Sequence, residues 1–81
     1  MQIKVHHFAA AADASGCSDE VVDLVDCATL ADLARTLIER HGPRMADVLQ
    51  IALFLQRDSM TRDLSVAAAA RVDILPPFAG G

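Results

Sequence analysis

Five strands are predicted from the pattern of apolar and polar residues, and the first and the last show it most clearly. In both, the two types of residue alternate, which is typical of a strand that buries one face. Ile3 and Val5 would face the core from the first strand. Val72 and Ile74 would do so from the last. In chain order, the predicted strands are Gln2–Phe8, Glu20–Val25, Ile51–Gln56, Met60–Arg62 and Arg71–Leu75.

One long helix is predicted over Leu30–His41, because apolar residues recur there at intervals of three and four. Thr29 occupies the N-cap position, and Asp32, three residues later, completes a short-armed variant of the capping box. Gly42 suits the position after the helix, and Pro43 prevents its continuation. Two shorter helical turns are expected over Ala9–Ala14 and Pro43–Leu49.

In the third predicted strand, alternation separates two sets of side chains. One set would face one way and comprises Ile51, Leu53 and Leu55; the other comprises Ala52, Phe54 and Gln56. Arg57–Ser59 is expected to form the turn that follows. It lacks the Asn-Gly or Asp-Gly pair that is typical of a tight hairpin.

Composition then limits the classes of function. The 81 residues suit one small domain, and a hydrophobic content of 53% supports a compact core with apolar surface left for a partner. A net charge of −4 disfavours nucleic-acid binding, which requires a basic patch. No run of 18 apolar residues is present, so no membrane span is expected. The N-terminus lacks the pattern of a secretory signal, and we expect a cytoplasmic protein.

The residues that usually build an active site are not spaced to do so. Cys17 and Cys27 are expected to be free thiols, and two cysteines cannot supply the four ligands of an iron–sulfur cluster. His6 and His7 are adjacent in a strand, so they point to opposite faces and cannot hold one metal ion. The sequence shows no nucleophile with a base, no phosphate-binding glycine loop and no metal-spaced cluster. We therefore expect neither a metal site nor a permanently bound cofactor.

The remaining chemistry lies in the last seven residues, Leu-Pro-Pro-Phe-Ala-Gly-Gly. The two prolines end the last strand, because proline removes a ladder donor. Phe78 is large enough to anchor the segment on a partner, and small residues follow it: Ala79, Gly80 and Gly81. Residues without side chains can enter a channel that is too narrow for others. We expect residues 1–77 to form one domain and residues 78–81 to form a flexible tail, which can span at most roughly 14 Å.

This ending resembles the C-terminus of the small subunit of molybdopterin synthase, in a family that also contains the thiamine sulfur carrier and is related to ubiquitin. The resemblance covers the whole chain. It implies an α+β protein with the β-grasp fold, in which a mixed sheet packs on one main helix and the first and last strands run parallel at its centre. Family members usually carry an Asp-Gly-Asp type of turn before the last strand. Here Ala68–Ala70 stand in its place, so we expect a different or a less stable turn.

The resemblance also implies a function for Gly81. An activating enzyme related to the ubiquitin-activating enzymes would adenylate its carboxylate with ATP and magnesium, and a persulfide sulfur donor would convert it to a thiocarboxylate. The sulfur would then pass to cyclic pyranopterin monophosphate inside the large synthase subunit. On this interpretation the chain is a carrier subunit and not an enzyme on its own.

Partner docking is expected to use outward-facing apolar residues. Phe8 and Leu75 match family positions that contact the partners, and Phe54 is expected to join them on the same face; covering the sheet edge is the alternative role for the first two. Three other functions stay open. These are a sulfur carrier for thiamine or cysteine synthesis, a ubiquitin-like modifier joined to lysines through Gly81, and a non-covalent binding module. The two prolines before Phe78 favour the molybdopterin branch.

Overall fold

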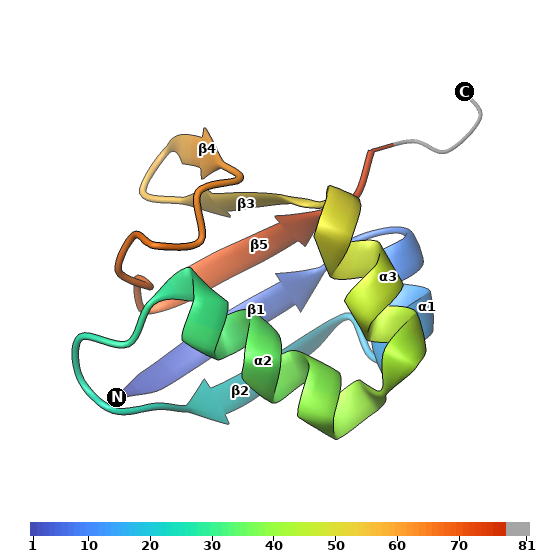
Figure 1. Cartoon of the computed structure of the whole chain (residues 1–81), viewed down its shortest axis with the longest axis horizontal. Coiled ribbons are helices and arrows are strands. Elements are labelled where there is room, and N and C mark those ends of the chain that lie inside the picture. The colour runs from blue at the N-terminus through green and yellow to red at the C-terminus, as the bar shows by residue number, and fades with distance from the viewer. Residues whose placement is uncertain (78–81) are drawn as a thin grey trace.

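A mixed five-stranded sheet runs through the computed structural model, which describes residues 1–77 (Figure 1). Its strands are β1 (Gln2–His7), β2 (Asp19–Asp23), β3 (Leu53–Gln56), β4 (Ser59–Thr61) and β5 (Arg71–Leu75). They lie in the order β2-β1-β5-β3-β4. β1 and β5 are parallel neighbours at the centre, and the other three pairs are antiparallel. The predicted β-grasp arrangement is therefore confirmed.

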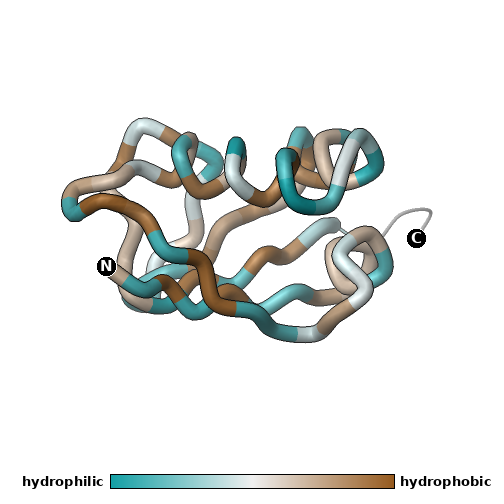
Figure 2. Tube along the Cα trace, turned by 90° about the horizontal axis from the view of Figure 1, so that it is seen from below, coloured by the Kyte–Doolittle hydropathy of each residue, from teal (hydrophilic) through white to brown (hydrophobic). Residues whose placement is uncertain are grey.

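Three helices accompany the sheet: α1 (Ala10–Ser15), α2 (Leu30–His41) and α3 (Pro43–Ile51). Figure 2 shows α2 and α3 as a layer on one side of the strands. The predicted bounds of α2 are confirmed, and so is its capping box: the Thr29 hydroxyl accepts from the Asp32 backbone N–H at 3.2 Å, while the Asp32 carboxylate accepts from the Thr29 N–H at 2.9 Å. Among residues 1–77, no helix is both long and apolar enough to cross a membrane.

α3 is a nine-residue helix, longer than the predicted turn, and it takes the first residue of the predicted third strand. Met45, Val48 and Leu49 are buried against the core at helical spacing, which favours continuing the helix to Ile51. β3 consequently begins at Leu53.

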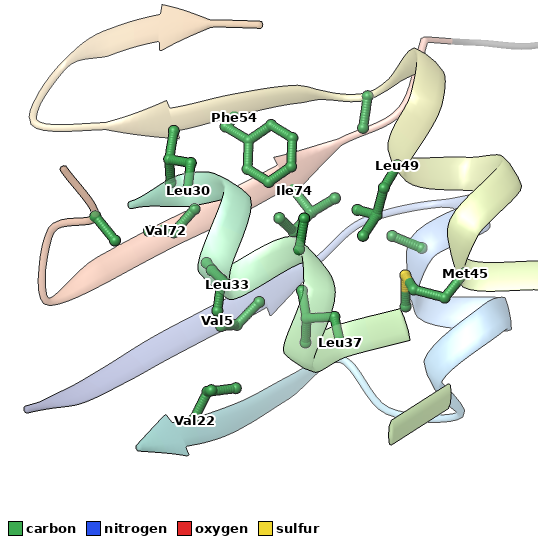
Figure 3. Close-up of a cluster of buried hydrophobic side chains, with 14 of the residues drawn as sticks. Val5, Val22, Leu30, Leu33, Leu37, Met45, Leu49, Phe54, Val72 and Ile74 are labelled. Atoms are coloured by element: carbon green, nitrogen blue, oxygen red, sulfur yellow. The ribbon is translucent and has the colours of Figure 1, made fainter. Parts of the chain in front are cut away.

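The core lies between the sheet and the helices (Figure 3). Its largest fully buried side chains come from every strand but β4 and from α2 and α3: Ile3, Val5, Val22, Leu30, Leu33, Leu37, Met45, Phe54, Val72 and Ile74. The inward positions predicted for the first and last strands are all among them. Because the hydrophobic effect scales with apolar area removed from water, this cluster is the main source of stability of the fold.

Phe54 is part of this core, which corrects the prediction that it lies on the outer face. Its side chain is only 1% exposed. Phe54 is paired with Ile74 across β3 and β5, and directly opposite residues share a face of the sheet. Leu53, which is paired with Leu75, takes the outward position instead. In Figure 3 the ring of Phe54 lies on the same side of the sheet as Ile74.

The turn between β3 and β4 is a two-residue hairpin turn formed by Arg57 and Asp58. Both have positive φ, 50° and 64°, and Gln56 pairs with Ser59 across the turn. Positive φ at both central residues is the requirement of a type I′ turn, which Asn and Gly normally meet. The hairpin thus forms with residues that are less suited to it, and each one carries backbone strain.

The alanines before β5 form a different turn from the glycine-containing one expected of the family. None of Ala68–Ala70 has a positive φ, and Ala68 and Ala69 are buried. The Gln56 side chain holds this segment, since its amide N–H donates to the Ala67 carbonyl at 2.9 Å and its amide oxygen accepts from the Ala69 N–H at 2.8 Å. Small buried side chains and a side-chain clamp therefore replace glycine here.

Candidate docking face and C-terminal segment

The face of the sheet opposite the helices has an apolar region around the end of β5. The Phe8 N–H donates to the Ile74 carbonyl at 3.2 Å, which extends the parallel pairing by one residue and brings Phe8 beside Leu75. Leu53 pairs with Leu75 from the other side. Phe8 is 45% exposed, and Leu53 and Leu75 are half-buried. The predicted outward placement of Phe8 and Leu75 on adjacent strands is confirmed, and their docking role stays a prediction.

Two further apolar side chains extend this region towards β4. Leu55 pairs with Met60, and Met60 is 60% exposed. We call the five residues together the apolar face: Phe8, Leu53, Leu55, Met60 and Leu75. Exposed apolar residues that gather in one place are typical of a protein-binding surface.

The other half of the same sheet face is polar. Lys4 pairs with Arg71 across β1 and β5 and with Val21 across β1 and β2. These residues line a shallow depression together with His6 and Asp19. Arg71 also forms an ion pair with Asp73 at 3.4 Å. A partner that covers the whole face would therefore meet apolar side chains near the end of β5 and two cations at its start.

The predicted reactive segment continues directly from the apolar face. β5 ends at Leu75, and two proline residues follow it. The residues assigned to the tail lie outside the described part of the chain, and their roles stay predictions: Phe78, Ala79, Gly80 and Gly81.

Sequence reasoning missed a second group of polar side chains, on the inner side of β1 and β2. The Glu20 carboxylate binds three partners: Arg40 donates to its Oε1 at 2.7 Å, and the Nε2 atoms of His7 and His41 lie 2.6 Å and 2.7 Å from its Oε2. The His7 side chain is fully buried, and those of Glu20 and His41 are only 11% and 13% exposed.

The charge of this group is set by its hydrogen bonds. Burial raises the pKa of the Glu20 carboxyl, but the hydrogen bonds from Arg40, His7 and His41 together outweigh it and hold that pKa at about 2. Glu20 is therefore ionised at neutral pH. A sequence signal for the cluster exists, because His7 lies in phase with Val5, and Glu20 with Val22. A polar residue at an inward position needs a partner in the core.

Comparison with known proteins gives structural likenesses only. No protein-family profile matches this chain, and no curated protein matches its sequence. Small archaeal modifier protein 1 from Haloferax volcanii superimposes with a TM-score of 0.82 at 24% identity, and the match covers 100% of both chains. The protein of the same name from Methanosarcina acetivorans gives a TM-score of 0.78 at 19% identity, over 99% of this chain and 96% of that one.

A third solved structure connects the fold with molybdopterin. A protein from Pyrococcus furiosus assigned as molybdopterin converting factor, subunit 1, superimposes with a TM-score of 0.80 at 17% identity. The match covers 95% of this chain and 98% of that chain. At these identities the likenesses establish the fold. The chain has the ubiquitin-like β-grasp fold, which is also the fold of these three solved structures.

Proposed function

We propose that this protein is a sulfur carrier, the small subunit of a molybdopterin synthase. The observation that carries the proposal is the arrangement around Leu75. The last strand leaves the centre of the sheet beside the exposed Phe8 and leads at once into Pro-Pro-Phe-Ala-Gly-Gly. A partner that docks on the apolar face would receive the following residues directly into its own pocket. The likeness to the Pyrococcus furiosus protein supports the same assignment.

The proposed chemistry takes place on the carboxylate of Gly81. A free carboxylate is a poor acyl donor, so an activating enzyme first transfers AMP to it from ATP and releases pyrophosphate. The terminal sulfur of a persulfide then attacks the acyl carbon and expels AMP, which leaves an acyl disulfide. A second thiol reduces that disulfide, becomes oxidised in turn, and releases the thiocarboxylate. In the large subunit, the thiocarboxylate sulfur bonds to a carbon of cyclic pyranopterin monophosphate. Water then hydrolyses the acyl–sulfur bond, which leaves the sulfur on the pterin and restores the Gly81 carboxylate.

The chain's own contribution is position. It presents the reactive end on a rigid sheet, and its partners supply the nucleotide pocket and the acid–base groups. No permanently bound cofactor takes part, since ATP and magnesium belong to the activating enzyme. A carrier for thiamine or cysteine synthesis would follow the same steps with another acceptor.

A ubiquitin-like protein modifier is the second candidate, and the two small archaeal modifier structures favour it. In that case a lysine amine of a target protein, and not a persulfide, would attack the acyl adenylate. The product would be an isopeptide bond to Gly81 with release of AMP. Both candidates need the same docking face and the same activated end.

Intact-mass spectrometry separates the candidates. The chain is incubated with ATP, magnesium, its activating enzyme and a persulfide donor, and a chain without Gly81 serves as the control. Replacement of one oxygen by sulfur, in the full chain only, is the result expected of a carrier. Conjugates of higher mass in a cell extract would instead establish a modifier. An unchanged mass in the purified reaction together with no conjugates in the extract, with an activating enzyme that loads its own established carrier, would refute both.

A further inference from the structure

Four side chains with metal-binding atoms meet where β1, β2 and the end of α2 come together. A ring nitrogen of His7, the Cys17 Sγ and a carboxylate oxygen of Glu20 all lie within 4.8 Å of one another. His41 Nε2 lies 2.7 Å from Glu20 Oε2. We propose that these four residues form a binding site for a divalent cation of the zinc type.

The donor set matches the chemistry of zinc. Two imidazoles, one thiolate and one carboxylate are ligands that Zn²⁺ takes in tetrahedral sites, at about 2.0–2.3 Å each. Donor atoms around such an ion lie about 3.3–3.7 Å apart, by the geometry of a tetrahedron with those bond lengths. Here the Cys17 sulfur lies 3.8 Å from the Glu20 oxygen, and the two imidazole nitrogens lie 2.6 Å and 2.7 Å from it. Binding therefore requires both imidazoles to move away from the Glu20 oxygen by less than the length of a bond. It also requires His41, which lies outside the three-residue group, to move closer to His7 and Cys17.

The two carboxylate oxygens of Glu20 have different partners, so one oxygen can bind a metal ion while the other keeps its hydrogen bond. Arg40 binds Oε1 at 2.7 Å, whereas His7 and His41 both meet Oε2. A cation on Oε2 would leave the Arg40 hydrogen bond in place, and a hydrogen bond of this kind orients a ligating carboxylate. The Arg40 side chain is 41% exposed, so water screens part of its charge.

The affinity is limited by His7. Its Nδ1 is buried and has no hydrogen-bond partner among residues 1–77. When Nε2 binds a metal, the ring proton resides on Nδ1, and a ligating histidine usually donates that proton to an outer partner. Lack of such a partner weakens metal sites about 10–100-fold. We therefore expect weaker binding than in structural zinc sites, with access from the partly exposed side of Cys17 and His41.

A cation at this position would join four parts of the fold. It would tie the end of β1 to β2, to the loop before β2 and to the last residue of α2. The ligands lie on the inner side of β1 and β2, whereas the proposed reactive segment leaves the sheet from β5. The metal site is therefore independent of the proposed sulfur chemistry, and either can fail without the other.

The test uses the full chain, reduced and freed of metal with a chelator that is then removed. Zn²⁺ is titrated by calorimetry, and Co²⁺ serves as a spectroscopic probe because a cobalt–thiolate bond gives a near-ultraviolet charge-transfer band. The chain offers matched controls: Cys27→Ser for Cys17→Ser, and His6→Asn for His41→Asn. Cys27 is exposed outside the cluster, and His6 points to the opposite face from His7. Circular dichroism in chelator verifies that every variant is folded.

The expected result is one Zn²⁺ per chain, with release of the Cys17 thiol proton, and a Co²⁺ charge-transfer band. Cys17→Ser should abolish the band, and both Cys17→Ser and His41→Asn should weaken Zn²⁺ binding at least tenfold. The two control variants should bind as the natural chain does. The proposal is wrong if the natural chain takes up no Zn²⁺, if folded Cys17→Ser keeps the band, or if the control variants lose as much affinity as the cluster variants.

Discussion

Phe8 provides the sharpest test of the docking face, because its side chain is exposed and can be changed without disturbing the core. The substitution is Phe8→Asp. The matched control is Val25→Asp, which makes a similar exchange at a side chain that is 77% exposed in the segment between β2 and α2, away from the apolar face.

The size of the effect follows from the area that Phe8 can still bury. A buried aromatic side chain covers roughly 150–250 Å². The 45% of Phe8 that is exposed corresponds to about 90 Å² on this scale. At about 25 cal/mol per Å², loss of this contact costs about 2 kcal/mol of binding free energy, or a rise in Kd of about 30-fold. The aspartate carboxylate must also be desolvated, so this figure is a lower bound.

Binding is measured by calorimetry against the large synthase subunit and against the activating enzyme. Urea unfolding provides the folding control. The part of Phe8 that is already buried, about 110 Å² on the same scale, limits the loss of unfolding free energy in Phe8→Asp to about 3 kcal/mol, so binding is measured where unfolding curves show the variant to be folded. Unchanged Kd values for Phe8→Asp with both partners would refute the placement of the docking face. An equal loss of affinity in Val25→Asp would refute the idea that the contact is local to it.

Three further predictions concern stability and are made for chelator-treated protein. Replacing Arg57 and Asp58 together by Asn and Gly should raise the melting temperature by about 4–8 °C, because relief of positive-φ strain in a type I′ turn contributes about 1 kcal/mol in a domain of this size; a fall in melting temperature would contradict the turn assignment. Gln56→Ala should destabilise the chain by about 1–2 kcal/mol in urea and speed hydrogen exchange at the Ala69 amide, since two hydrogen bonds to the alanine segment are lost; unchanged exchange would show that the clamp is unimportant. The pKa of Glu20 is about 2 in the folded chain, whereas its ordinary value is 4.5. The ionised carboxylate therefore contributes fully to folding stability above pH 4.5, and this contribution is lost as the pH falls towards 2. Glu20→Gln should therefore cost stability at pH 7, by about 1–2 kcal/mol after the shift is discounted for solvent screening, and the natural and variant curves should converge near pH 2; a difference that does not depend on pH would contradict this.

Much of the fold could be predicted from local pattern. Alternation placed Ile3, Val5, Val72 and Ile74 in the core, and Thr29 marked the start of α2. The parallel pairing of β1 with β5 came from the family resemblance, since alternation identifies a strand but not its neighbours. These predictions succeeded because the same residues favour the observed strand or helix locally and also suit its burial in the fold.

The errors arose where the sequence allowed two structures and apolar residues suited both of them. β3 has Phe54 on one face and Leu53 and Leu55 on the other, so a period of two could not decide which face is buried. Pairing with β5 decided it. α3 ends later than predicted because Ile51 suits a strand as well as a helix, and packing of the preceding turns determined the outcome.

The cluster around Glu20 could not be found from spacing. His7, Glu20 and His41 are far apart in the sequence, and they meet only because β1 pairs with β2 and the end of α2 lies over both. The only local hint is that His7 and Glu20 are polar residues at inward positions of their strands. Motifs read from short spacings miss clusters of this kind.

The central claim is that the acid of Gly81 is the working part of the molecule, and adding one residue after it tests this most directly. Two chains, one ending in Gly81 and one with an alanine after it, are incubated with the activating enzyme, ATP, magnesium and a persulfide donor, and their intact masses are measured. The account predicts exchange of one oxygen for sulfur in the first chain and an unchanged mass in the second. Equal sulfur uptake by both chains would contradict it.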